Sequence, residues 1–156
     1  MSDFPWLLAM IVVPAVGAAA VAALPRGRER LARPVTLAVS GLVLLLAVLA
    51  AVAFDPGGAR FQLTTSVSWI PDFGVDFALG VDGIALVMLL LVGVLVPVVV
   101  AASWREDFGP GRRSLRAYLA WLLLLEATLG GVFAATDVFL FYVFFEAMLI
   151  LSLIHI

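Results

Sequence analysis

Five long, almost uninterrupted apolar stretches constrain the fold of this chain more than any other feature. A membrane-spanning α-helix needs about 20 mainly apolar residues, each adding 1.5 Å of rise. The first three stretches contain no charged residue, and each of the last two contains a single glutamate. The stretches are Phe4–Leu24, Val35–Phe54, Ile84–Trp104, Ala117–Thr136 and Val138–Ile156. The sequence therefore predicts an all-α membrane protein with five transmembrane helices.

The composition excludes several other classes of protein. The chain is 65% hydrophobic and 13% charged, whereas a soluble domain has about 45–50% apolar and about 25% charged residues. Such an apolar excess cannot be buried within 156 residues. There is no cysteine, which removes disulfides and thiolate metal sites, and only one histidine. The net charge of -2 excludes a basic nucleic-acid binder. We expect no metal, no cofactor and no nucleic-acid partner.

Two loops hold almost all of the arginines. Eight of the nine arginines follow the first or the third stretch, and only Arg60 belongs to the opposite side. The eight are Arg26, Arg28, Arg30, Arg33, Arg105, Arg112, Arg113 and Arg116. The opposite side collects Asp3, Asp55, Asp72, Asp76, Asp82 and Asp137. The positive-inside rule then predicts that the N-terminus lies outside and that the loops Pro25–Arg33 and Arg105–Arg116 lie in the cytoplasm.

The loop from Asp55 to Asp82 is the longest polar segment, and its apolar residues alternate with polar ones. This period of two is typical of half-buried strands. The alternating residues are Phe61, Leu63, Val67 and Trp69, then Val75, Phe77 and Leu79 after the turn-like run Pro71-Asp72-Phe73-Gly74. The pattern predicts a small β-hairpin at residues 60–80 on the outer face. Because a two-stranded ribbon is marginal alone, we expect its apolar face, which has nothing of its own to cover it, to dock on a partner.

Glu146 interrupts an apolar, aromatic run from Phe139 to Ile150. An ionised side chain at the centre of a span costs about 3 kcal/mol on insertion scales, so such a residue normally faces a protein interior or a hydrated cavity. Burial favours the neutral acid, and a carboxyl poised between its two forms can take up and release protons. The alternative is a polar group that only joins helices through hydrogen bonds.

A second glutamate, Glu126, lies in the preceding stretch. A tight turn at Thr136-Asp137 makes the last two stretches antiparallel neighbours, with Glu126 11 residues before Asp137 and Glu146 9 residues after it. These spacings put the two carboxyls at depths of about 16 and 14 Å, close to the middle of a 30 Å core. They suggest a relay or a shared-proton pair, provided that helix rotation turns them toward each other. Taken alone, Glu126 fits a structural role equally well.

Two aspartates stand where apolar stretches begin. Asp82 precedes the third stretch and Asp137 precedes the fifth. Aspartate is favoured at such positions because its carboxylate accepts from the first free amides of a helix. We therefore interpret both residues as structural caps. The pair Gly130-Gly131 is interpreted as a site of close helix packing.

Four motifs together point to a known family. They are Gly80-Val81-Asp82-Gly83-Ile84, Ala102-Ser103-Trp104, Gly131-Val132-Phe133 and the run from Asp137 to Ile150. This set resembles the subunit M family of bacterial NADH-quinone oxidoreductase, respiratory complex I. The Gly-x-Asp-Gly element is shared by the wider antiporter-like family, which includes subunit L and Mrp-type antiporters. The Tyr-x-Phe-Phe-Glu-Ala-Met run favours subunit M.

The resemblance implies a redox-inactive, proton-translocating subunit of the bacterial inner (plasma) membrane. Its neighbours would be subunits L and N, and it would meet quinone only through the whole complex. The family's essential fifth-helix glutamate falls on Glu146, whereas Glu126 matches a fourth-helix position that is acidic only in some members. The family couples this glutamate to a lysine on a later helix, and this chain has no lysine. We therefore expect residues 1–150 to form the N-terminal transmembrane region of a longer subunit.

The last six residues, Leu151 to Ile156, depart from the family pattern. They are the direct translation of a transposon-end adapter used in sequencing libraries, so we expect a non-native tail in which His155 has no function. The DNA at the junction tests this.

Two other functions stay open. One, in the same class, is a subunit of a Mrp-type cation/proton antiporter or of a membrane-bound hydrogenase. The other is a non-catalytic membrane scaffold in which Glu126 and Glu146 only help helices to pack.

Overall fold

The computed structural model describes residues 5–106 and 114–155. These ranges contain five α-helices, as the apolar stretches predict, and one two-stranded sheet. The helices are α1 Trp6–Ala22, α2 Ala32–Ala53, α3 Gly83–Ala102, α4 Leu115–Ala134 and α5 Val138–His155. Short 3-10 turns at Arg26–Leu31 (η1), Pro71–Phe73 (η2) and Ser103–Arg105 (η3) lie between them. Asp3, Phe4, Arg112, Arg113 and Ile156, which the sequence predictions used, lie outside the described residues.

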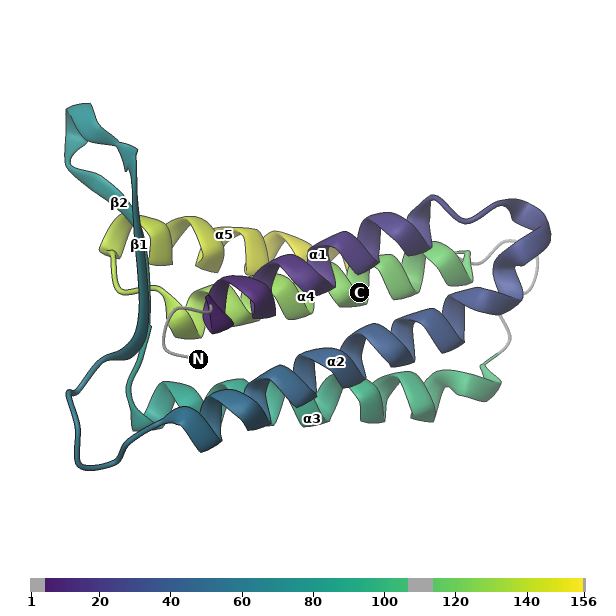
Figure 1. The fold of residues 1–156 in the computed structure, drawn as a ribbon. Helices are drawn as coiled ribbons and strands as arrows, with labels where there is room; N and C mark the ends of the chain where they lie inside the picture. The colour runs from purple at the N-terminus through teal and green to yellow at the C-terminus, as the bar shows by residue number, and fades with distance from the viewer. Residues whose placement is uncertain (1–4, 107–113, 156) are drawn as a thin grey trace.

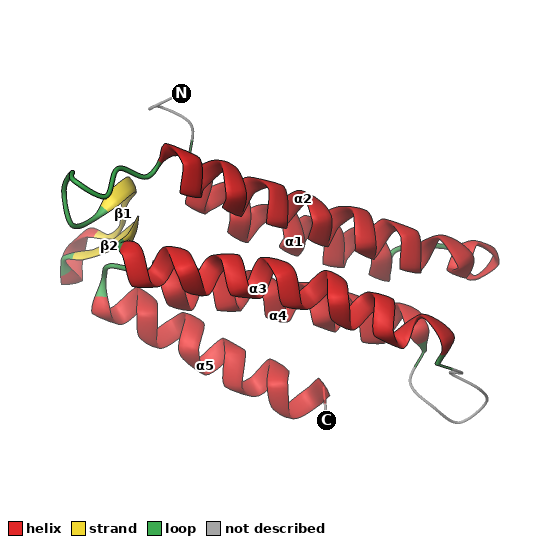
Figure 2. Ribbon diagram, turned by 90° about the horizontal axis from the view of Figure 1, so that it is seen from below, coloured by secondary structure: helices red, strands yellow, loops and turns green. Residues whose placement is uncertain are grey.

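The helices run alongside one another, and the hairpin crosses one end of the bundle (Figure 1). Helix α4 is central, because it packs against α1, α3 and α5 and also contacts α2. Helix α5 packs on α4 and touches β2, and it lies at the edge of the bundle (Figure 2). A side chain on α4 is therefore placed for deep burial, whereas α5 leaves much of its surface uncovered.

Glycines set the closest helix contacts. A Cβ atom on Gly17 of α1 would lie 2.7 Å from Cγ1 of Val39 on α2, so only glycine permits that approach. The same holds where the ring of Phe144 on α5 lies against Gly131 of α4. The interpretation of Gly130-Gly131 as a close-packing site is confirmed for Gly131. At Gly130, a Cβ atom would make an ordinary 3.7 Å contact with Ile11.

The apolar core forms two clusters along the bundle. The first lies at the hairpin end and joins Leu7, Met10, Ala50, Leu86 and other helix residues to Leu79 and Val81 of β2. The second lies toward the opposite end and includes Val21, Ala32, Val100, Leu119 and Leu123. The base of the hairpin is therefore part of the core and is not an appendage to it.

The hairpin consists of β1 Gln62–Ile70 and β2 Val75–Val81, paired antiparallel as predicted. The turn closes at Gly74, whose φ of +65° is a backbone conformation that glycine adopts at little cost. The base is tied to the end of α4, because the amide of Thr136 donates to the carbonyl of Ala78 at 3.0 Å. The far end projects past the edge of the helices (Figure 1).

The expectation that the hairpin has nothing of its own to cover its apolar face was wrong for Trp69 and Phe77. The rings of Trp69 and Phe139 lie 5.9 Å apart, and those of Phe77 and Phe144 lie 6.3 Å apart, so two aromatic residues of the hairpin pack on α5. The strand register also shifts between Gln62 and Thr65, which breaks the simple alternation at the start of β1. The sequence pattern could not reveal that α5 lies beneath the hairpin.

Within the described ranges, three helical segments are long and apolar enough to cross a membrane. They are Gly27–Ala53, Gly83–Arg105 and Leu115–Ala134. The helices Trp6–Ala22 and Val138–Ile154 are apolar but shorter. The elements are thus those of a helical membrane protein with a small antiparallel sheet, as predicted, and three of the five predicted spans are helices of spanning length.

Candidate functional site

Glu126 lies on the buried face of α4. Its side chain is 1% exposed, and it stands among Leu122, Leu123, Ala127 and Gly130, which also face inward. Along α4, Glu126 lies between the two apolar clusters. Leu122 and Leu123, which precede it, belong to the cluster away from the hairpin, and Ala134, which follows it, belongs to the cluster at the hairpin end. A helix period of 3.6 residues brings Glu126 onto the same stripe as its leucine neighbours. The local sequence therefore places a carboxyl where an apolar side chain would be expected.

Neither carboxyl oxygen of Glu126 has a hydrogen-bond partner within the described part of the chain. Other buried polar residues differ in this respect, because their hydroxyls donate to carbonyls of their own helices. The distances are 2.7 Å for Thr36, 3.1 Å for Ser40 and 2.8 Å for Thr128. A buried carboxylate without a partner is costly. Such a group is typical of sites that bind and release a proton.

Glu146 has a different environment. It is half-buried on α5, the peripheral helix, and residues on either side of it, such as Phe145 and Leu149, are exposed. Within the described ranges it forms no ion pair. The sequence predicted similar depths for the two glutamates, and α4 and α5 do pack together. No hydrogen bond joins the two carboxyls, because both oxygens of Glu126 are without a partner.

The two aspartates stand at helix starts. Oδ1 of Asp82 accepts a hydrogen bond from the amide of Ala85 at 2.8 Å, at the beginning of α3. Oδ1 of Asp137 accepts from the amides of Phe139 and Leu140 at 2.9 and 3.2 Å, at the beginning of α5. This geometry satisfies helix amides that have no partner within the helix. The capping contacts fix the ends of α3 and α5 beside the hairpin.

The described Asp and Glu side chains are dispersed. Across residues 5–106 and 114–155, no three His, Cys, Asp or Glu side chains gather as a metal ion would require.

Comparisons with known proteins identify the family. No protein-family profile matches the chain. NADH-quinone oxidoreductase subunit M from Mycobacterium tuberculosis is 39% identical over 175 aligned residues, which cover 96% of this chain. NADH-ubiquinone oxidoreductase chain 4 from Arabidopsis thaliana is 34% identical over 145 residues and covers 92% of it. The chain belongs to the subunit M and chain 4 family. The resemblance to the subunit M family is thus confirmed.

A solved structure of a relative agrees with this assignment. A chain of respiratory complex I from Thermus thermophilus, solved with bound NADH, superposes on 95% of this subunit M homologue with a TM-score of 0.75 and 28% sequence identity. The present chain spans only about a third of the length of the relatives that it matches. It covers 32% of the Mycobacterium protein, 28% of the Arabidopsis protein and 28% of the Thermus chain.

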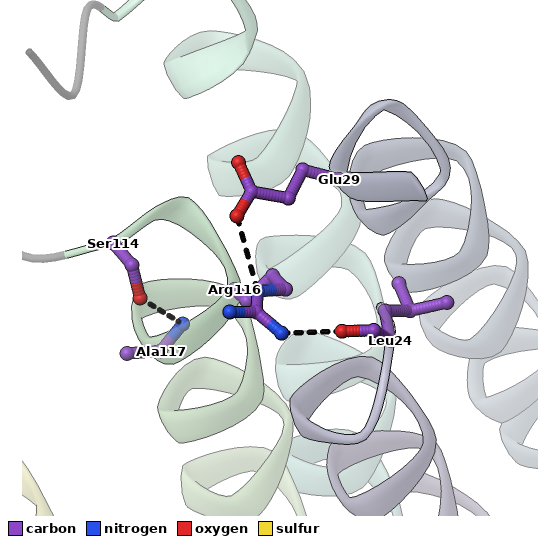
Figure 3. A network of polar contacts seen from close by, with 5 residues as sticks. All are labelled: Leu24, Glu29, Ser114, Arg116 and Ala117. Atoms are coloured by element: carbon purple, nitrogen blue, oxygen red, sulfur yellow. Dashed lines mark hydrogen bonds and ion pairs between the residues drawn. The ribbon is translucent and has the colours of Figure 1, made fainter. Parts of the chain in front are cut away.

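The sequence analysis of this subunit M homologue did not predict one polar network, which lies at the start of α4. Arg116, at the start of α4, forms an ion pair with Glu29 at 3.4 Å and donates a hydrogen bond to the carbonyl of Leu24 (Figure 3). Ser114 caps the same helix, because its Oγ accepts from the amide of Ala117 at 3.2 Å. The sequence analysis used the arginines only as signs of topology. Ser114, three residues before the apolar stretch that begins at Ala117, was the signal that could have located this helix start.

Proposed function

We propose that this chain is part of a proton-translocating membrane subunit of NADH-quinone oxidoreductase. The whole complex would couple electron transfer from NADH to quinone to the movement of protons, with no redox chemistry in this chain itself. The observation that carries the proposal is the buried, unpartnered carboxyl of Glu126 in a chain of the subunit M and chain 4 family. A carboxyl at membrane depth that is not held by other protein groups can exchange a proton without breaking a structural contact.

We assign the principal proton-carrying role to Glu146 and a supporting role to Glu126. Glu146 belongs to the Tyr-x-Phe-Phe-Glu-Ala-Met run of the family, and its partial exposure on α5 leaves its carboxyl accessible to a further helix of the longer subunit. Glu126 lies on the neighbouring helix α4 and is enclosed by the bundle. The two carboxyls would exchange a proton through water, since no direct hydrogen bond joins them.

We further propose that all five helices cross the bacterial inner membrane with the N-terminus outside. The charges support this orientation. Within the described residues, Arg28, Arg30, Arg33, Arg105 and Arg116 belong to loops and helix ends away from the hairpin, whereas Asp55, Asp72, Asp76, Asp82 and Asp137 belong to the hairpin end. The shorter helices α1 and α5 pack lengthwise on α4, which has spanning length, so they lie at the same membrane depth.

The proposed partners are other membrane subunits of complex I, with subunits L and N as neighbours. The hairpin supports this, since its outer part offers apolar residues that the bundle does not cover, among them Val67 and Phe73. Quinone would be reached only through the whole complex.

The test is Glu146→Gln in the full-length subunit within its complex. Glutamine keeps the shape of the side chain and can form hydrogen bonds, but it cannot become an anion. We expect the complex to assemble while proton translocation, and the electron transfer coupled to it, fall sharply. Glu146→Asp should be intermediate, because the charge survives on a shorter side chain. Normal pumping by an assembled Glu146→Gln complex would leave the scaffold function in its place.

A further inference from the structure

An open groove runs between the last turns of α1 and the first turns of α4. It has a volume of about 400 Å³ and is lined by five alanines from the two helices, with Trp121 and Leu124 on the α4 side. The groove exists because alanine side chains are too short to fill the space between the helices. Its surface is almost wholly apolar. Exposure of this surface to water would be unfavourable, whereas in a bilayer the groove would be exposed to hydrocarbon.

The groove begins at the end of the bundle that carries the arginines. Ala22 is the last residue of α1, and Ala117 is the third residue of α4. Along α4 the lining extends from Ala117 to Leu124, a rise of about 10 Å. This length lies within one leaflet, whose hydrocarbon half is about 15 Å deep, and it is too short to seat a transmembrane helix of about 30 Å. It matches the upper part of one lipid acyl chain.

Basic residues lie at the same end of the bundle as the mouth of the groove. Arg116, next to the lining residue Ala117, is held by Glu29 and by the carbonyl of Leu24 (Figure 3). Glu29 is thereby occupied, although its side chain is 49% exposed. Arg28 and Arg30 flank it on η1, and their exposed side chains form no hydrogen bond or ion pair with the described residues. This end of the bundle therefore carries two arginines, Arg28 and Arg30, that form no ion pair with the described residues.

We propose that this groove binds an anionic phospholipid, with one acyl chain along the alanines and the phosphate against Arg28 and Arg30. A basic mouth above an apolar groove at headgroup level matches the two parts of such a lipid. Trp121 lies about 9 Å along α4 from its start, near the membrane interface, where tryptophan is favoured. A zwitterionic lipid offers the same chains without a net charge, so the arginines give the site its selectivity. The inference requires membrane embedding but not proton translocation.

Photo-crosslinking in the full-length subunit within its complex tests the site. The complex is placed in vesicles that contain phosphatidylglycerol or phosphatidylcholine with the same photoreactive acyl chain, and labelled peptides are identified by mass spectrometry. We expect the peptide that contains Ala117–Leu124 to be labelled several-fold more by phosphatidylglycerol. The double variant Arg28→Gln and Arg30→Gln should reduce that labelling to the phosphatidylcholine level. Arg60→Gln, an exposed arginine at the hairpin end, is the matched control and should leave it unchanged.

A second variant tests the groove itself. Ala120→Trp fills the space between the helices and should abolish labelling of this peptide by both lipids, in complexes that co-purify with all their subunits. Equal labelling by the two lipids, or labelling that ignores Arg28 and Arg30, would overturn the proposal. So would a groove peptide that reacts with neither lipid, because another protein segment would then occupy the site. These outcomes are independent of pumping, so they distinguish failure of the lipid site from failure of the proposed function.

Discussion

Two glutamates that look alike in the sequence occupy different places in the molecule. Each interrupts an apolar stretch, and the spacing from Asp137 predicts almost equal depths for Glu126 and Glu146. Depth follows from rise per residue, which the sequence fixes, but exposure depends on helix rotation and on which helices are neighbours. The structure resolves this difference. Glu126 is enclosed by the central helix bundle and has no partner in it, whereas Glu146 is half-buried on the outermost helix.

Glu126→Gln is expected to preserve assembly and to lower proton translocation less than Glu146→Gln does. The amide removes the exchangeable proton from a position that contributes no hydrogen bond to the fold. If the two carboxyls form a relay, the double variant should cost less than the sum of the single changes. Proton pumping by the reconstituted full-length complex measures this. Asp72→Asn, an exposed carboxyl-to-amide change in the hairpin turn, should have no effect. Additive losses would contradict the relay.

Gly131→Val should separate α5 from α4, because any Cβ there meets the ring of Phe144. Overpacking of this kind costs about 1–3 kcal/mol, and thermal denaturation of the full-length complex should show the loss. Gly130→Ala is the matched control: its Cβ would make an ordinary 3.7 Å contact with Ile11, so it should be tolerated. The second change Phe144→Leu should recover part of the loss. Equal stability of the two glycine variants would contradict the close contact.

At the level of elements, the sequence predicted five helices and the hairpin, because each has a strong local period. The helix ends are less regular. The second helix was predicted to start at Val35, but it starts at Ala32. The charged Arg33 interrupts the apolar pattern, so the first turn was not recognised as part of the stretch. The packing of the hairpin's apolar face against α5 could not be predicted from the sequence. A bulge near Leu63 and the ring contacts of Trp69 and Phe77 with α5 depend on tertiary packing that no local pattern encodes.

The contacts of Trp69 change which residues should test docking of the hairpin. Trp69→Ala would weaken subunit association and also loosen the hairpin from Phe139. Phe73, 81% exposed in the turn, and Val67, 59% exposed, are freer of such contacts. We expect Phe73→Ala with Val67→Ala to reduce co-purification of neighbouring subunits while the isolated subunit keeps its stability. Ser68→Ala, on the same strand, is the control. Full assembly of the double variant would refute docking through this surface.

For the whole molecule, topology is the property about which the sequence makes its most direct prediction. Membrane insertion responds to the charges of short loops, and these are visible without a structure. The arrangement of the helices is another matter. That α4 would be the central helix and α5 the outermost follows from which apolar faces match, and nearly uniform apolar helices carry little periodic signal about their neighbours. The groove between α1 and α4 is a product of that arrangement and had no counterpart in the sequence analysis.

Single-cysteine labelling on this cysteine-free sequence tests the orientation and the number of spans together. In intact cells, a membrane-impermeant thiol reagent should label Asp72→Cys in the hairpin turn and should label Arg30→Cys in η1 only after the membrane is opened. Both positions are exposed in the bundle, so a difference between them reports sidedness and not burial. A cysteine at position 2 should behave like position 72 if α1 spans the membrane despite its 17 residues. Labelling of Arg30→Cys from outside would show that the orientation is the reverse of the one proposed. Protection of the cysteine at position 2 would show that α1 does not cross the membrane.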